Sequence, residues 1–190
     1  MKHIDDIKKK LEWEKYYSLD ELTWNSGIFY TNNRFTEDFI REFADRVNWY
    51  YISKDQQLSE SFMEEFEDDI DWWCISQRQI LSENFIRKYA NKVAWNLISM
   101  YQTLSEDFIM EFKDKVSWKI ISVGQKLSEE FIREFKDEVD WSLISSSQVL
   151  SEAFIREFKD EVDWDYISIH QTLSKDFICE FKEKLRNIYN

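Results

Sequence analysis

Apolar residues recur along this chain at helical spacings, and the whole pattern returns every 23 residues. Five apolar residues of one copy share the spacing i, i+4, i+5, i+8 and i+12: Leu127, Phe131, Ile132, Phe135 and Val139. This spacing predicts a helix with one apolar face. Ser128 precedes the face as an expected N-cap, and Glu129 and Glu130 follow it in the first turn, where carboxylates oppose the positive end of the helix dipole.

A second, shorter helix is predicted in each copy after a polar capping position. In the same copy, Asp140 precedes Trp141, Leu143 and Ile144. The equivalent position holds a capping residue type in five of the six copies: Asn48, Asp71, Ser117, Asp140 and Asp163. Ala94 is the exception, so we expect the second helix of that copy to fray more easily.

The period of 23 residues excludes one long helix. Six full copies run from Phe35 to Thr172, each with a tryptophan at the same place: Trp49, Trp72, Trp95, Trp118, Trp141 and Trp164. An α-helix turns by about 100° per residue, so successive apolar sets would point roughly 140° apart. The chain must therefore fold back within each copy, and a unit this small buries its apolar face only by stacking on its neighbours.

The predicted fold class is all-α, an α-solenoid of tandem two-helix 23-residue repeats with divergent terminal caps. Residues 1–34 match the pattern only in part, through Trp24, Ile28, Phe29 and Asn33, and are expected to form a divergent N-terminal capping unit, with a charged helix over Met1 to Glu14. Residues 35–172 form the six helical repeats. Residues 173–190 repeat the first helix and then diverge, which predicts a C-terminal half-repeat cap.

The most regular positions are interpreted as structural. Phenylalanine at the fifth position, isoleucine at the eighteenth and the six tryptophans keep their class in every repeat, which favours core packing. A stacking platform for bases or sugars is the alternative for the tryptophans. Recurrent serine and glutamine near the end of the second helix are expected to bond backbone groups that would otherwise lack partners.

Composition narrows the class of protein. The chain has 190 residues, of which 43% are hydrophobic, enough for a substantial core and too many for a disordered chain. Neither an 18-residue apolar run nor an apolar N-terminal segment is present, so we expect a soluble, cytoplasmic protein without a membrane span or secretory signal. Cys74, on the inner face of a second helix, and Cys179 occupy unrelated positions and are expected to be reduced.

Three positions on or just after the second helix differ from repeat to repeat. We expect stacking to align them into one protein-binding row, because grouped exposed apolar residues often mark a partner site. The candidate residues of this variable row are Tyr50, Trp73, Arg78, Met100, Tyr101, Lys119, Val123 and His170. Neutral drift at unconstrained positions, with some of these side chains buried, is the alternative.

The first helices carry the acidity of a chain whose net charge is −13. Three repeats are expected to form acidic patches: Glu65, Asp68, Asp69, Glu134, Asp137, Glu138, Glu157, Asp160 and Glu161. This charge argues against direct binding of nucleic acid or anionic membranes and permits a basic partner. A solvated face that keeps the array soluble is the alternative.

The sequence favours a non-enzymatic protein without cofactor or metal. Only His3 and His170 are available, and nucleophile, phosphate-loop and HExxH motifs are absent. Asp68, Asp69 and Asp71 lack the ligand spacing and glycine of a calcium loop. We therefore predict no catalytic residues.

The repeat LSEEFIREFKDEVDWSLISSSQ resembles short tandem helical repeats found in uncharacterised proteins of giant DNA viruses, phages and some bacteria. The resemblance covers Phe35 to Leu185 and implies a helical array without a defined activity. The leading hypothesis is a protein-binding repeat scaffold, viral or phage-encoded, that acts on a host protein, for example in counter-defence. The alternative is an acidic mimic of nucleic acid that inhibits a basic host protein.

Overall fold

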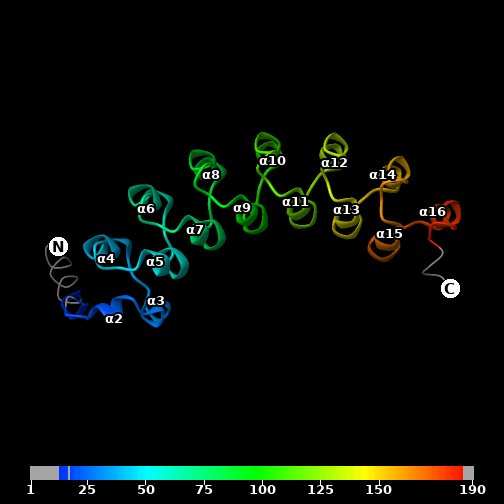
Figure 1. Cartoon of the computed structure of the whole chain (residues 1–190). Coiled ribbons are helices and arrows are strands. Elements are labelled where there is room, and N and C mark those ends of the chain that lie inside the picture. Colours follow the sequence, from blue (N-terminus) through cyan, green and yellow to red (C-terminus); the bar gives the residue numbers. More distant parts are fainter. Residues whose placement is uncertain (1–12, 17, 186–190) are drawn as a thin grey trace, which may run out of the picture. The chain divides into compact units, whose positions relative to one another are not determined.

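The computed structural model describes residues 13–16 and 18–185, and these residues form helices, turns and extended connections without strands (Figure 1). The chain divides into two compact units, residues 1–94 and residues 95–190. The first contains α2 (Glu21–Trp24), α3 (Gly27–Asn32), α4 (Glu37–Glu42), α5 (Trp49–Asp55), α6 (Glu60–Glu65), α7 (Trp72–Arg78) and α8 (Glu83–Lys88). The second contains α9 (Trp95–Tyr101), α10 (Glu106–Glu111), α11 (Trp118–Gly124), α12 (Glu129–Glu134), α13 (Trp141–Ser147), α14 (Glu152–Glu157), α15 (Trp164–His170) and α16 (Lys175–Glu180).

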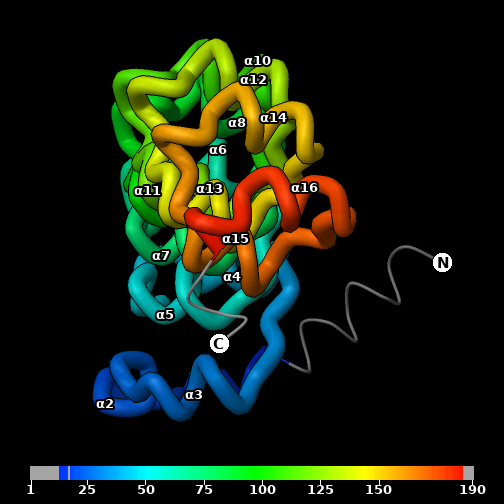
Figure 2. The backbone as a smooth tube through the Cα atoms, turned by 90° about the vertical axis from the view of Figure 1, so that its right-hand side faces the viewer, coloured from blue at the N-terminus to red at the C-terminus, as the bar shows by residue number. Residues whose placement is uncertain are grey.

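In both units the first and second helices of the repeats form separate layers. In the second unit, α10, α12 and α14 lie in one layer and α11, α13 and α15 in the other (Figures 1 and 2). The predicted all-α solenoid of tandem two-helix repeats is confirmed. The part of the chain predicted as a helix over Met1 to Glu14 lies almost wholly outside the described residues.

Serine brings successive second helices together. α11 and α13 contact each other closely, as do α13 and α15, and α5 and α7 in the first unit. Ser122 is fully buried, donates a hydrogen bond from Oγ to the Trp118 carbonyl at 2.7 Å and accepts one from the Asp140 N–H at 3.0 Å. The small serine side chain therefore lets the two helices pack closely, and its hydroxyl accepts a hydrogen bond from the backbone of the next repeat.

Glutamine links the ends of the second helices, as the sequence predicts. Gln125 donates from Nε2 to the carbonyls of Ser99 and Gln102, at 3.2 and 2.8 Å. Its Oε1 accepts from the Leu104 N–H at 3.1 Å. Gln148 repeats the same set of bonds one repeat later, to Ser122, Gln125 and Leu127.

The tryptophans pack on the next repeat, but all six are only half-buried. The Trp118 ring lies 6.2 Å from the Phe131 ring and 5.0 Å from the Phe135 ring, measured between centroids. Its Nε1 donates to the Lys113 carbonyl at 3.0 Å. The tryptophan rings therefore fill the space between adjacent repeats. This packing favours a structural role for the tryptophans over a stacking platform for bases or sugars.

The predicted first helix is too long. In the fifth full copy α12 ends at Glu134, and Phe135 takes φ −108° and ψ 30°. Turns then carry the chain to Val139, whose N–H bonds the Phe135 carbonyl at 3.1 Å. A straight helix to Val139 would lead the chain away from the position of α13. The bend at Phe135 redirects the chain toward the start of α13. The second helix is also not the shorter one, since α13 has seven residues and α12 six.

Most of the predicted N-caps form. Ser128 accepts from the Phe131 N–H at 3.1 Å, and Asp140 accepts from the Leu143 N–H at 3.1 Å. Ser117 does not cap α11 through its side chain, so that prediction is wrong. Its own N–H instead donates to the Ser99 Oγ at 3.0 Å, which anchors the start of the helix through the neighbouring repeat.

The N-terminal cap reproduces the serine contact with a different residue. Tyr30 occupies the place of the buried serine, and its hydroxyl donates to the Trp24 carbonyl and accepts from the Asn48 N–H, both at 2.7 Å. The side chain is fully buried, and burial raises the pKa of its phenol. Gly27 makes room nearby, because a β-carbon there would lie 2.8 Å from Cε1 of Tyr51.

Candidate protein-binding surfaces

The residues of the variable row are exposed, while their neighbours on the same helices are buried. In the first unit, Trp73 is 55% exposed, whereas Ile75 and Ser76, two and three residues further on, are fully buried. In the second unit, Met100 is 54% and Tyr101 50% exposed, beside the fully buried Ile98 and Ser99. The helical period that seats isoleucine and serine in the core therefore turns the variable positions to solvent.

The remaining candidates of the row divide between the two units in the same way. Tyr50 and Arg78 are exposed in the first unit, and Lys119, Val123 and His170 are exposed in the second. The Lys54 ammonium lies 5.5 Å from the Tyr50 ring, and His170 lies 6.0 Å from the Tyr166 ring. The part of the alternative in which some of these side chains are buried is thus wrong for the eight candidates, whereas neutral drift and a role in binding both stay predictions.

Exposed apolar side chains also lie at positions that the sequence did not single out. Ile80 and Val149, each two residues beyond the end of a second helix, are 91% and 94% exposed. Ile169 on α15, by contrast, occupies the same variable position as Met100 and Val123, and it is 65% exposed. The first two share the last position of the repeat, where Gln57, Lys126 and threonine also occur. The variation between polar and apolar residue types at this position is the sequence signal that could have predicted its exposure.

Several carboxylates of the predicted acidic patches form ion pairs with lysine or arginine. Four of the nine predicted residues form ion pairs with a cation of an adjacent repeat, within the described residues: Glu65 with Arg41 at 2.7 Å, Asp68 with Lys92 at 3.2 Å, Glu157 with Arg133 at 2.9 Å and Asp160 with Lys184 at 4.0 Å. The predicted like-charge patches are to that extent wrong, because stacking brings cations from 24 residues away. The other five, for which the described residues show no ion pair, are Asp69, Glu134, Asp137, Glu138 and Glu161.

The ion pairs between repeats follow one geometric rule. An arginine on one first helix lies over a phenylalanine of the next and bonds the glutamate three residues beyond that ring: Arg133 lies 5.0 Å from Phe154 and bonds Glu157. Arg41 and Arg156 repeat this arrangement. At one step the charges are exchanged, and Glu64 pairs with Lys88 at 3.0 Å.

First-turn glutamates make a contact that the sequence did not predict. Glu129 lies in the first turn of α12, as predicted, and its carboxylate lies 3.6 Å from the Arg133 guanidinium. Its Oε1 also accepts from the Ser151 N–H of the next repeat at 2.6 Å. Glu152 bonds Ser174 in the same way, and these hydrogen bonds lower the pKa of its carboxyl. These carboxylates are part of the stacking contacts rather than of a binding surface.

Two grooves lie between the first-helix segments of the second unit. One, of about 380 Å³, is lined by Met110, Lys113, Glu134, Phe135, Asp137 and Glu138. The other, of about 260 Å³, is lined by Lys136, Asp137, Glu157, Phe158, Asp160 and Glu161. Asp137 belongs to both, so the two grooves are adjacent. Each has an aromatic side chain between a lysine and several carboxylates.

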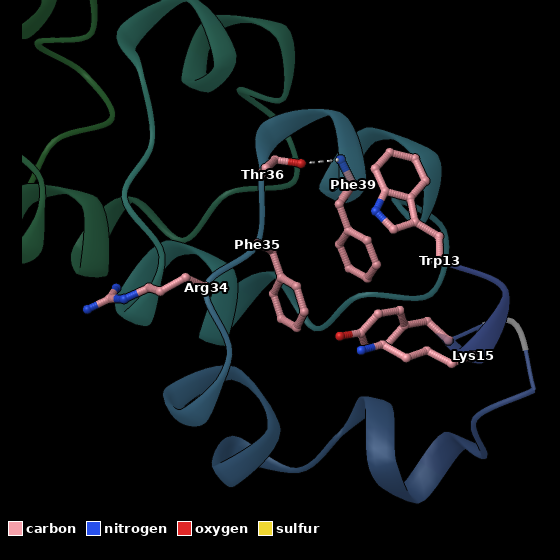
Figure 3. A pocket seen from close by; sticks show the side chains of 7 residues that line it. Trp13, Lys15, Arg34, Phe35, Thr36 and Phe39 are labelled. Atoms are coloured by element: carbon pink, nitrogen blue, oxygen red, sulfur yellow. Dashed lines mark hydrogen bonds between the residues drawn. The ribbon is translucent and has the colours of Figure 1, made fainter. Parts of the chain in front are cut away.

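An aromatic pocket of about 420 Å³ lies in the N-terminal cap, lined by Trp13, Lys15, Tyr16, Arg34, Phe35, Thr36 and Phe39 (Figure 3). The rings of Phe35 and Phe39 face each other at 4.5 Å, whereas Arg34 extends away from them and bonds the Asp55 carbonyl at 2.7 Å. Trp24, whose ring stacks on Phe39 at a centroid distance of 6.3 Å, is buried with its Nε1 unpaired. The carbonyl five residues earlier, which the repeat tryptophans use, is taken here by Arg46 at 2.8 Å.

The two cysteines differ in burial. Cys74 is buried on the inner face of α7 as predicted, and desolvation raises the pKa of its thiol to about 11, whereas Cys179 is exposed. Asp71 caps α7 through the Cys74 N–H at 2.8 Å, as expected for a cap. In the part of the chain that the structure describes, no group of three or more His, Cys, Asp or Glu side chains is arranged to hold a metal ion.

Comparison with known proteins leaves the repeat without an assigned relative. Over the described residues, the helices are too short or too polar to cross a membrane. The resemblance to viral and phage repeats remains an expectation from the repeat motif. No family model, curated protein or solved structure matches the chain.

Proposed function

We propose that this protein is a non-enzymatic protein-binding scaffold whose second helices present the variable row to a partner. The observation that carries the proposal is the contrast on single helices between invariant, fully buried residues and exposed apolar ones such as Trp73, Met100 and Tyr101. Exposed aromatic side chains cost little conformational entropy on binding and dominate interface energetics. A repeat array that varies only these positions changes its partner without changing its fold.

The partner proposed is a host or other cellular protein. The resemblance of the repeat to those of viral and phage proteins supports a host protein, and the net charge of −13 disfavours direct binding of nucleic acid. The second candidate, an acidic mimic of nucleic acid, needs a continuous run of unpaired carboxylates. Its support is weaker, because cations of adjacent repeats pair with four of the nine predicted acidic residues.

The test is affinity capture with the wild-type protein and with the double variant Trp73→Ser/Tyr101→Ser. Both side chains are about half exposed, so the melting temperature should stay within a few degrees while bound partner falls at least tenfold. The matched control is Leu22→Ser/Ile28→Ser, which removes two exposed apolar side chains outside the row. A partner retained equally by the first variant, or lost equally from the control, contradicts the assignment.

A further inference from the structure

The net negative charge of the second unit is concentrated in two repeats. Residues 127–163 contain 11 carboxylates and four cations, whereas residues 95–126 and residues 164–190 each contain four of either sign. The two grooves between first-helix segments lie on this acidic stretch. The larger groove combines three carboxylates, Glu134, Asp137 and Glu138, with one lysine and an apolar floor at Met110 and Phe135.

The larger groove lacks an arginine that other repeats supply themselves. Arg41, Arg133 and Arg156 each lie 4.8–5.0 Å from a phenylalanine of the next repeat and bond its glutamate at 2.7–2.9 Å. At the equivalent place here the chain has Met110, which is 42% exposed, and no ion pair forms at Glu134 within the described residues. The ring beneath is correspondingly less covered, since Phe131 is 5% exposed while its three counterparts are fully buried.

The same groove also lacks a lysine that lies over the tryptophan in three other repeats. Lys115 lies 5.7 Å from the Trp95 ring, and equivalent lysines cover Trp72 and Trp164 at 5.7 and 6.0 Å. For Trp118 the equivalent position, 20 residues on, is Glu138, as it is Asp69 for Trp49 and Glu161 for Trp141. Trp118 packs on Phe135 in the floor of the groove, and the structure shows no cation over its ring among the described residues.

We propose that this groove binds a lysine- or arginine-rich peptide segment of a partner protein. The peptide supplies two cations, one to Glu134 and one to Glu138, of the kind that three other repeats provide at each of these places. Charge-assisted hydrogen bonds and ring contacts strengthen each other where water is partly excluded. The adjacent groove, which shares Asp137, extends the acidic surface for further basic residues of the same segment, while Lys113 and Lys136 limit how many it accepts.

This surface is separate from the variable row, because it is built from the first-helix segments rather than the second helices. The groove would recognise its peptide through charge, whereas the variable row would recognise its partner through exposed apolar side chains. The two proposals therefore fail independently. Trp73→Ser/Tyr101→Ser should leave the affinity for a basic peptide unchanged.

The test is isothermal titration calorimetry of the full chain with heptalysine and heptaarginine, against a neutral glycine–serine heptapeptide. Both basic peptides should bind and the neutral one should not. Glu134→Gln/Glu138→Gln should weaken binding at least tenfold. Asp107→Asn/Asp176→Asn, which changes the net charge equally at exposed sites outside the grooves, should weaken it less than threefold.

A second variant tests the internal comparison itself. Met110→Arg places the missing cation in the chain and should weaken peptide binding at least fivefold while the melting temperature is maintained or raised. Met110→Leu, which adds no charge, should retain the wild-type affinity. Equal losses from Asp107→Asn/Asp176→Asn and Glu134→Gln/Glu138→Gln would show unspecific attraction to the acidic chain. That result, or unchanged binding by Met110→Arg, would overturn the proposal.

Discussion

Replacing Gln125 by leucine should destabilise the second unit far more than an ordinary loss of one polar side chain. Gln125 is 7% exposed and bonds three backbone groups: the carbonyls of Ser99 and Gln102 in the preceding repeat, and the N–H of Leu104 at the start of its own repeat. Leucine has a similar size, so the substitution removes the hydrogen bonds without opening a large cavity. The three backbone groups then lie in the interior without this partner.

The expected cost follows from the number of groups left unpaired. A buried donor or acceptor that loses its partner costs about 1–3 kcal/mol. Partial access of water to one of the three groups leaves a loss of roughly 3–6 kcal/mol in the free energy of unfolding. This is large compared with the ~5–15 kcal/mol that typically separates folded from unfolded domains.

Urea unfolding monitored by far-ultraviolet circular dichroism measures the total loss. Because repeat arrays can unfold in stages, hydrogen exchange of the Leu104 amide reports the local effect. The Leu58 amide, which bonds Gln79 Oε1 at 3.1 Å in the first unit, is an internal reference that should change less. The matched control is Gln57→Leu at an exposed position. If Gln125→Leu costs no more than this control, the glutamine bonds do not hold the repeats together.

Three further predictions concern single residues. Tyr30→Phe should cost about 1–3 kcal/mol, because it leaves the Asn48 N–H without its acceptor. Since burial raises the pKa of this phenol, the folded wild type retains the proton above pH ~10, where the unfolded chain loses it. The stability of the wild type should therefore fall above that pH. Melting temperatures measured across this pH range should fall less for Tyr30→Phe. A thiol reagent at pH 8 should modify Cys179 rapidly and Cys74 only after denaturation, and rapid modification of both would contradict the burial of Cys74. Gly124→Ala should raise stability by about 0.5–1 kcal/mol in urea titration, because Gly124 is helical and a β-carbon there meets no atom within 4 Å; a destabilised variant would refute this.

The repeat and its two helices were readable from the sequence because they depend on local interactions. Apolar residues at helical spacing predicted the buried face that includes Phe131 and Ile132, and capping residue types predicted the starts of α12 and α13 at Ser128 and Asp140. These features need only neighbours within a few residues. A period of 23 residues then repeated each signal often enough to separate it from chance.

The contacts between repeats, and with them the surfaces, were decided by the tertiary structure. Arg133 pairs with Glu157, Ser117 is anchored by Ser99, and Tyr30 replaces a serine. Each contact joins residues 18 to 24 apart, and its partner is set by how one repeat stacks on the next. Helical periodicity contains no information about that stacking. It therefore could not distinguish carboxylates paired with a neighbouring arginine from those that face the groove beside Met110.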